Sequence, residues 1–168
     1  MPKYARFAAS FLNVGLSVVI AGSAFAADVR PMSDAKKVTA IFPASAKVRV
    51  LNVWATWCAP CVAEMPDLRA LDGAFGDEMA VVGVSLDDMI PNAKPAAVAS
   101  FLDKQQIAYP NVYYTGETEA LGAYLKMTGE IPLTIVYDRS GNELWRLQGQ
   151  IERDKMLARL RDTLRRMQ

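Results

Sequence analysis

Residues 53–66 read VWATWCAPCVAEMP and contain the only two cysteines of the 168-residue chain. The apolar, β-branched run Val48–Trp54 before the cysteines predicts a buried strand. Residues 59–75, which follow Cys58 and include Cys61, have the apolar spacing of a helix. Cys58 is therefore expected at a helix N-terminus, where unpaired N–H groups and the helix dipole favour a thiolate. Cys61, one turn further along, is expected to be buried and to remain a thiol.

Two cysteines at this spacing suit a pair that cycles between dithiol and disulfide. Cys58 would be the attacking nucleophile, and Cys61 would resolve the mixed disulfide with a partner. A purely structural disulfide would close so short a loop that it would remove little entropy from the unfolded chain. A zinc site is disfavoured because it needs about four ligands, and the chain has no histidine and no other cysteine. A Cu(I) carrier that uses the two thiolates, with Met65 as a further soft ligand, remains an alternative.

The other elements are predicted from the same patterns of apolar residues. Residues 79–86 form a second continuous apolar run, which is typical of a central strand covered on both faces. Further helices are predicted at residues 95–105, 117–126 and 152–167, and further strands at 111–114, 133–138 and 143–147, the last two joined by a hairpin turn. This order predicts an α/β fold in which helices cover both faces of one sheet.

The N-terminal residues differ from the rest of the chain. Lys3 and Arg6 precede an uncharged stretch over residues 7–27, and the run 24–26 (AFA) places small residues near its end. This is the layout of a secretory signal peptide over residues 1–26, cleaved after its last residue. The alternative is an uncleaved membrane anchor, because about 20 apolar residues can span a bilayer.

The remainder is expected to comprise a linker over residues 27–46 and one domain over residues 47–168. The formal charge of the whole chain is +1, which gives no electrostatic reason to expect nucleic-acid binding. Neither a metal nor an organic cofactor is expected.

The absence of histidine bears on the direction of the redox chemistry. No imidazole beside the cysteines can stabilise the reduced thiolate and so make the pair oxidising. Each tenfold loss of thiolate stabilisation lowers the reduction potential of a two-electron couple by about 30 mV. The pair is therefore expected to act as a reductant, with a disulfide oxidase or isomerase as the alternative.

The motif W-x-x-W-C-x-P-C followed by E-x-P, within residues 53–66, resembles the thioredoxin superfamily, and most closely its TlpA/ResA/CcmG group of exported thiol reductants. Residues 129–134 (GEIPLT) are similar to the glycine–proline–threonine segment of that group. The resemblance covers residues 48–167 and implies a thioredoxin-like fold, with a central mixed β-sheet and helices on both faces. It also implies that the Ile131–Pro132 peptide bond is cis and lies against the Cys58–Cys61 disulfide.

Four further residues belong to the predicted site, and the resemblance assigns the roles of Ile131 and Pro132. Substrates would bind in an extended conformation to the backbone at Ile131 and Pro132. Trp57 suits either packing or the docking of a partner, and Pro60 stiffens the turn between the cysteines.

Glu64 is the implied proton carrier of the site. In thioredoxin a buried aspartate two residues before the first tryptophan serves the second cysteine, but that position is Asn52 here, which cannot titrate. The resemblance implies that Glu64 takes over this proton-transfer role. The alternative is a solvated carboxylate that stabilises the first helical turns through the helix dipole.

The resemblance also implies partners outside the cytoplasm, in the periplasm. The implied electron donor is a membrane protein of the DsbD/CcdA kind. The implied substrates are protein disulfides, either of apocytochrome c before haem attachment or of the copper-site cysteines of a respiratory oxidase. A peroxiredoxin-like peroxidase is disfavoured because the pattern P-x-x-x-T-x-x-C is missing around Cys58.

Overall fold

The computed structural model of the chain describes residues 26–167. The strands are β1 (Val29–Met32), β2 (Val48–Trp54), β3 (Met79–Ser85), β4 (Asn111–Tyr114), β5 (Leu133–Asp138) and β6 (Glu143–Gln148). The α-helices are α1 (Ala59–Leu71), α2 (Pro95–Lys104), α3 (Thr118–Leu125) and α4 (Arg153–Arg166), and the 3-10 helices are η1 (Ala35–Lys37), η2 (Gly76–Glu78) and η3 (Asp87–Met89). The predicted signal peptide, residues 1–26, lies outside the described residues except for Ala26.

The strands form one mixed sheet in the order β1-β4-β3-β2-β5-β6. The pairs β1–β4, β4–β3 and β3–β2 are parallel, whereas β5 runs antiparallel to both β2 and β6. The two long apolar runs of the sequence are the adjacent central strands β2 and β3, which pair along their whole length. Nearly all of their side chains are buried, because both faces of the sheet are covered.

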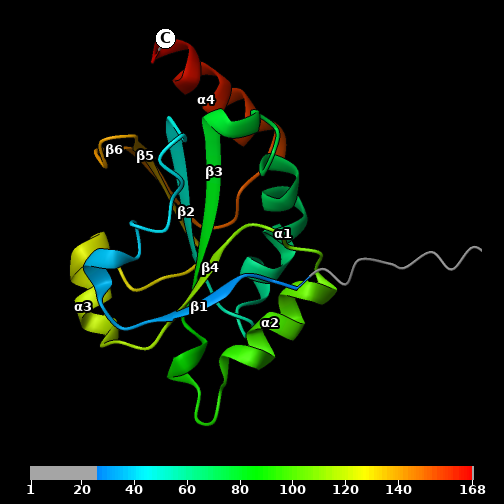
Figure 1. The fold of residues 1–168 in the computed structure, drawn as a ribbon, viewed down its shortest axis with the longest axis vertical. Coiled ribbons are helices and arrows are strands. Elements are labelled where there is room, and N and C mark those ends of the chain that lie inside the picture. The colour runs from blue at the N-terminus through cyan, green and yellow to red at the C-terminus, as the bar shows by residue number, and fades with distance from the viewer. Residues whose placement is uncertain (1–25, 168) are drawn as a thin grey trace, which may run out of the picture.

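Helices cover both faces of the sheet (Figure 1). α1 and α4 contact each other on one face, whereas α3 and η1 contact each other on the opposite face. α2 lies on the side of α1 and contacts the edge strand β1. The parallel crossovers β2–α1–β3 and β3–α2–β4 share a hand, which places their helices on the same side. The predicted α/β class with helices on both faces is confirmed.

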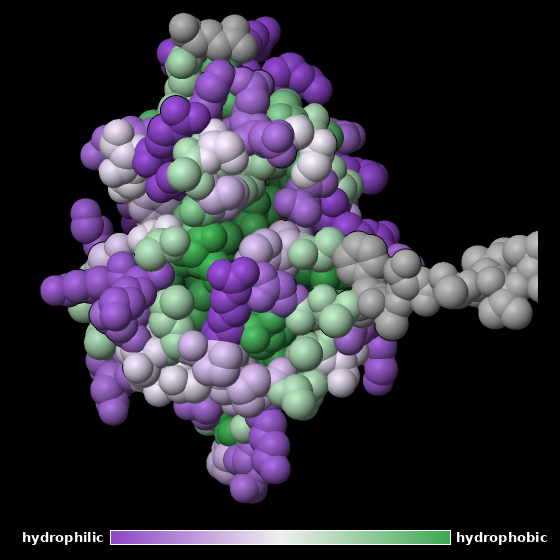
Figure 2. Space-filling model, in the orientation of Figure 1, coloured by the Kyte–Doolittle hydropathy of each residue, from purple (hydrophilic) through white to green (hydrophobic). Residues whose placement is uncertain are grey.

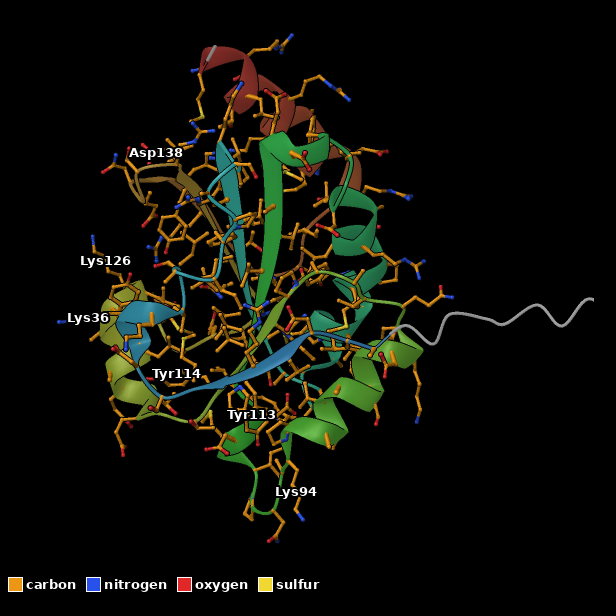
Figure 3. All side chains as sticks on the ribbon, viewed as in Figure 1. Lys36, Lys94, Tyr113, Tyr114, Lys126 and Asp138 are labelled. Atoms are coloured by element: carbon orange, nitrogen blue, oxygen red, sulfur yellow. A yellow bond between two sulfur atoms is a disulfide. The ribbon has the colours of Figure 1, made fainter. Side chains whose placement is uncertain are left out.

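Apolar side chains fill the interior, and charged ones project outwards. Figure 3 shows Lys36, Lys94 and Lys126 pointing away from the body of the protein, whereas Tyr113 and Tyr114 of β4 are buried. On the face that carries β1, an apolar band crosses the middle of a largely polar surface (Figure 2). None of the helices within residues 26–167 is both long enough and apolar enough to cross a bilayer.

The predicted element boundaries agree with the structure to within one residue, with one exception. Helix α1 ends at Leu71 rather than at Phe75. Asp72 already has an extended backbone, with ψ 123°, and Gly73 has φ 82°, a left-handed conformation that favours glycine. This backbone reversal ends the helix although apolar residues continue at helical spacing.

The prediction of a linker over residues 27–46 is wrong. Val29–Met32 is the edge strand β1, which pairs in parallel with β4 along its length. Ala35 and Val38, which follow it, are buried in the core. Pro31 obscured the strand in the sequence, but an edge strand tolerates proline because one of its sides needs no ladder donor.

Strands β2, β3 and β4 approach one another closely around Gly83. The buried side chain of Asn111 accepts a hydrogen bond from Trp54 Nε1 at 3.0 Å and donates one to the Tyr109 carbonyl at 3.0 Å. A methyl group at Gly83 would overlap the Asn111 side-chain oxygen and would lie 2.9 Å from Trp54 Nε1. The absence of a side chain at this position therefore makes room for the buried hydrogen bond between the strands.

Replacing Gly83 with alanine is expected to lower the free energy of unfolding by about 2–4 kcal/mol, because the methyl group displaces a buried hydrogen bond in a packed core. Urea denaturation followed by tryptophan fluorescence measures this loss. Gly122→Ala is the control, since Gly122 lies in α3 and the added methyl group would have no neighbour within 4 Å. The control is expected to be neutral or to stabilise by up to about 1 kcal/mol. Equal losses of unfolding free energy in the two variants would contradict the close approach of the strands at Gly83.

Candidate functional site

Cys58 and Cys61 lie where β2 gives way to α1. A short turn follows the end of β2, and Cys58 is the N-cap of α1, with an extended backbone (φ −89°, ψ 99°). The two sulfur atoms form a disulfide, and the backbone N–H of Cys61 points at Cys58 Sγ over 3.3 Å. Cys61 is fully buried, whereas 6% of Cys58 is exposed. A partner molecule can therefore reach the pair only at Cys58.

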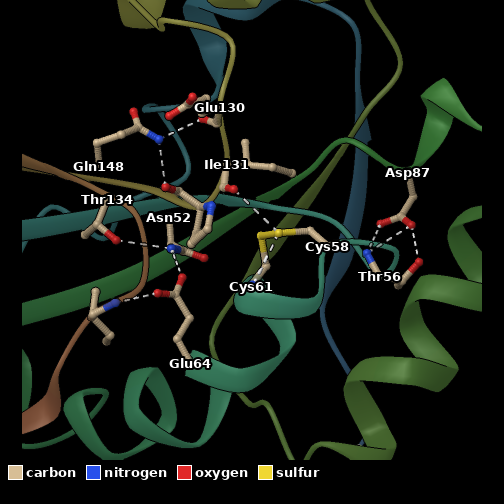
Figure 4. Close-up of a disulfide and its surroundings, with 12 residues drawn as sticks. Asn52, Thr56, Cys58, Cys61, Glu64, Asp87, Glu130, Ile131, Thr134 and Gln148 are labelled. Atoms are coloured by element: carbon tan, nitrogen blue, oxygen red, sulfur yellow. Dashed lines mark hydrogen bonds between the residues drawn. A yellow bond between two sulfur atoms is a disulfide. The ribbon is translucent and has the colours of Figure 1, made fainter.

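The loop that precedes β5 lies directly against the disulfide (Figure 4). Cys58 Sγ is 3.7 Å from the carbonyl oxygen of Ile131, and the Ile131–Pro132 peptide bond is cis, as the resemblance implies. Trp57, Pro60 and Ile131 line an open hollow of about 560 Å³ at Cys58. Four residues singled out in the sequence therefore meet at one surface, with Pro132 buried beneath it.

Gln148 at the end of β6 holds this loop, which the sequence did not indicate. Its Nε2 donates hydrogen bonds to the carbonyl oxygens of Glu130 at 3.0 Å and of Pro132 at 3.1 Å (Figure 4). The Pro132 oxygen also accepts one from the backbone N–H of Gly149 at 2.9 Å. One side chain therefore bridges the carbonyls on both sides of Ile131. No sequence signal marks Gln148, because the contact depends on how β6 pairs with β5.

Asp87, which follows β3, holds the turn between β2 and Cys58. This buried carboxylate accepts hydrogen bonds from the backbone N–H of Thr56 at 3.2 Å, from the Thr56 hydroxyl, and from the Ser85 hydroxyl at 2.6 Å (Figure 4). The sequence analysis missed this residue. The available signal was a carboxylate directly after a buried parallel strand, because the carboxyl ends of neighbouring parallel strands meet at one edge of a sheet.

Glu64 lies deeper, on the buried side of α1 (Figure 4). Its Oε1 accepts a hydrogen bond from Asn52 Nδ2 at 2.8 Å, and its Oε2 accepts one from the backbone N–H of Ile151 at 2.8 Å. Asn52 Nδ2 also lies 3.2 Å from Thr134 Oγ1, to which it donates. The alternative of a solvated carboxylate is therefore wrong, because the side chain is fully buried and both of its oxygens are bound by the protein.

Burial raises the pKa of Glu64 to about 7, although the hydrogen bonds from Ile151 and Asn52 work in the opposite direction. Cys61 is one helical turn away on the same buried side of α1. Residues three apart on a helix have their Cβ atoms within about 6 Å of each other. A carboxyl group that titrates near neutral pH at this distance is suited to accept or release a proton near the Cys61 sulfur.

The two tryptophans near the pair have different environments. Trp54 is buried, stacks on Phe101 with 5.9 Å between ring centroids, and donates to Asn111, so it is a packing residue. Trp57 is 48% exposed. It lines the hollow at Cys58 and also an adjoining cavity of about 250 Å³. The other large apolar side chains that line this cavity are Leu86, Met89, Met127 and Ile131.

Within residues 26–167, no three or more His, Cys, Asp and Glu side chains gather as a metal site. Met65, the additional soft ligand considered for a Cu(I) carrier, is buried in the core. The disulfide and the Glu64 carboxyl are thus the groups of this site that can exchange electrons and protons.

The stability of the oxidised protein is expected to depend on the ionisation of Glu64. Its pKa of about 7 in the folded protein exceeds the ordinary value of about 4.3 in the unfolded chain. The folded state then holds a proton that the unfolded state releases, so stability is full below about pH 4.3 and falls as the pH rises through 7. The loss is about 3–4 kcal/mol.

Urea titrations of the wild type and of Glu64→Gln at several pH values measure this effect. The stability of the wild type relative to the variant is expected to decrease between pH 4 and 8, because glutamine cannot ionise. A difference in unfolding free energy that stays constant over this range would contradict the raised pKa. The pH-independent offset between the two proteins reports only the altered hydrogen bonds to Asn52 and Ile151.

The chain is similar to several known proteins. It matches the AhpC/TSA family over residues 26–143. It is 31% identical over 114 residues to the thiol-disulfide oxidoreductase ResA of Oceanobacillus iheyensis, an alignment that covers 67% of this chain and 55% of that protein. The chain thus spans about half the length of this relative.

Solved structures show the same fold. A DsbF homologue from Corynebacterium diphtheriae superposes with a TM-score of 0.61 at 25% identity, covering 73% of this chain and 74% of that one. A thioredoxin-related protein from Neisseria meningitidis serogroup B superposes with a TM-score of 0.55 at 26% identity, covering 67% of this chain and 82% of that one. The family match extends over well more than half of the sequence. By its sequence and its thioredoxin-like architecture, the chain belongs to the AhpC/TSA family.

Proposed function

We propose that this protein is an exported thiol–disulfide oxidoreductase that reduces disulfides in partner proteins. The observation that carries the proposal is the asymmetry of the pair. Cys58 lines an open hollow at the start of a helix, whereas Cys61 is fully buried with a carboxyl group of raised pKa behind it. Disulfide exchange needs one accessible nucleophile and one protected resolving thiol, and the two positions meet these needs.

The first step is the attack of the Cys58 thiolate on one sulfur of the substrate disulfide. The bond between Cys58 Sγ and the substrate sulfur forms as the substrate S–S bond breaks, and the second substrate sulfur leaves as a thiolate. The helix dipole and the Cys61 N–H, which points at Cys58 Sγ, stabilise the attacking anion. Once the pair is reduced, the neighbouring carbonyl of Ile131 is in place to accept a hydrogen bond from a protonated Cys58.

The second step releases the product. The Cys61 thiol loses its proton to the Glu64 carboxylate and attacks Cys58 Sγ, which forms the disulfide and frees the remaining substrate sulfur as a thiolate. The substrate gains two electrons and the protein loses two. Because the pKa of Glu64 is about 7, the carboxyl can take this proton and return it to water near neutral pH.

A protein substrate is supported by the surface around Cys58. Trp57 is an exposed aromatic side chain, and Ile131 presents backbone groups beside the sulfur. The adjoining apolar cavity extends the contact area beyond what a small thiol needs. We infer that an extended segment of the partner lies across Trp57 and Ile131 with its disulfide at Cys58.

The absence of histidine supports the reducing direction, and the resemblance to the TlpA/ResA/CcmG group supports the partners. The chain has no histidine to stabilise the reduced thiolate and make the pair oxidising. The proposed electron donor is a membrane protein of the DsbD/CcdA kind, and the proposed substrates are apocytochrome c or the copper-site cysteines of an oxidase. The periplasmic location is proposed from the signal-peptide layout of residues 1–26.

Trapping in cells tests the function directly. Cys61→Ser is expected to accumulate mixed disulfides between Cys58 and partner proteins, because the resolving thiol is gone. Non-reducing gels and mass spectrometry of the captured species identify the partners. In a protein-disulfide reduction assay, Cys58→Ser is expected to fall below about 1% of the wild-type rate, because the nucleophile is lost.

The control for trapping is the double variant Cys58→Ser with Cys61→Ser, which should capture nothing. Capture of small thiols alone by Cys61→Ser would remove the support for protein substrates. Capture that persists without Cys58 would place the nucleophile elsewhere.

Gln148 provides a test of the docking surface. In Gln148→Leu the carbonyls of Glu130 and Pro132 lose a shared donor, so the loop that receives the substrate is less well fixed. We expect KM for a protein disulfide to rise by about tenfold, which corresponds to roughly one hydrogen bond. The rate with a small aromatic disulfide is expected to stay unchanged. Gln150→Leu, at an exposed position nearby, is the control, and an equal loss with both substrates would argue against a docking role.

A further inference from the structure

Near the start of the described residues, the chain contacts the C-terminal end of α2. The backbone N–H of Ala27 donates a hydrogen bond to Asp103 Oδ1 at 2.7 Å. Ala27 is partly buried against the core, whereas Ala26 before it is exposed. One residue later, the carbonyl of Asp28 accepts a hydrogen bond from the Asn111 backbone N–H at 2.8 Å, which opens the pairing of β1 with β4.

Asp103 occupies an electrostatically unfavourable place on its helix. It lies in the last turn of α2, which ends at Lys104. The C-terminal end of a helix carries a partial negative charge, so a carboxylate there is disfavoured and a cation is favoured. A positive charge at the nitrogen of Ala27 would therefore interact favourably with both the Asp103 carboxylate and the helix end.

The neighbouring charges leave Asp103 as the partner for such a cation. Asp28, the other carboxylate next to Ala27, already forms a two-point ion pair with Arg30, with N–O distances of 2.8 and 2.6 Å. In the sequence, small residues stand at positions 24 and 26, which is the pattern that a signal peptidase requires before the bond it cleaves. Hydrolysis of the Ala26–Ala27 bond would create a positive charge at the nitrogen that already faces Asp103.

We propose that Asp103 is the binding site for the α-ammonium group of a processed chain that begins at Ala27. In the processing step, water adds across the Ala26–Ala27 peptide bond. The carboxylate stays on Ala26, and the amine on Ala27 takes up a proton. The neutral amide contact with Asp103 becomes an ion pair, which fastens the edge strand β1 to α2.

The ion pair acts at one edge of the sheet. β1 pairs with a strand on one side only and contacts α2. Edge elements with few partners open locally at low cost. A charge-assisted contact one residue before the first bond of the β1–β4 ladder opposes this fraying. Processing therefore stabilises the N-terminal edge of the domain at the moment when the segment before Ala27 is removed. This inference rests on the proposed export but not on the proposed thiol chemistry.

The first test determines the processing site. The full chain is produced in a Gram-negative host that exports it, and the intact mass of the periplasmic protein is measured. We expect a species that begins at Ala27. A species that begins at another residue, or that keeps residues 1–26, would overturn the proposal. Disulfide reduction is assayed on the same sample, so an inactive protein that begins at Ala27 would count against the proposed function alone.

The second test measures the ion pair through hydrogen exchange of the amides of β1. Asp103→Asn is made in the processed chain and in a full chain in which Ala26→Leu blocks cleavage. In the processed chain we expect exchange to accelerate by about two- to fivefold, the range for an exposed ion pair. In the uncleaved chain the effect is expected to be smaller, because asparagine still accepts from a neutral amide. Asp77→Asn on η2 is the remote control and should change neither chain. Equal acceleration in the two chains would overturn the assignment of Asp103.

Discussion

The site depends on one constraint, which is that α1 must begin only a short turn after the carboxyl end of β2. β2 is paired with β3 on one side and with β5 on the other, and almost all of its side chains are buried, so its end is firmly placed. The chain then turns and Cys58 becomes the N-cap of α1. The helix dipole and the Cys61 N–H are consequently directed at Cys58 Sγ. The loop before β5 adds the Ile131 carbonyl, which lies against the same sulfur.

Around this point, the fold combines tight packing with a group that opposes stability. The buried hydrogen bond from Trp54 to Asn111, which the missing side chain at Gly83 makes room for, links the central strands. Glu64, by contrast, is a buried carboxyl whose pKa is raised to about 7 by desolvation. A domain that buries an ionisable group beside its reactive sulfur gives up stability at neutral pH, and such local conflicts are typical of functional sites.

Much of the architecture could be predicted because its signals are local. The uninterrupted apolar runs identified β2 and β3 as central strands, and the position of the cysteines between β2 and α1 identified the reactive turn. β1 escaped prediction because Pro31 and partly exposed side chains disguise an edge strand. Gln148 and Asp87 escaped because they act through hydrogen bonds to residues of other elements, and these contacts appear only when the sheet is assembled.

The sequence by itself determined the order of elements and which sulfur stands at a helix start, since both follow from residue spacing along the chain. Only the tertiary structure decided which groups surround that sulfur. It buried Glu64 between Asn52 and the backbone of Ile151, and it set the loop of Ile131 against Cys58. The physical reason is that desolvation and hydrogen-bond geometry depend on segments far apart in the sequence, whose juxtaposition no local pattern records.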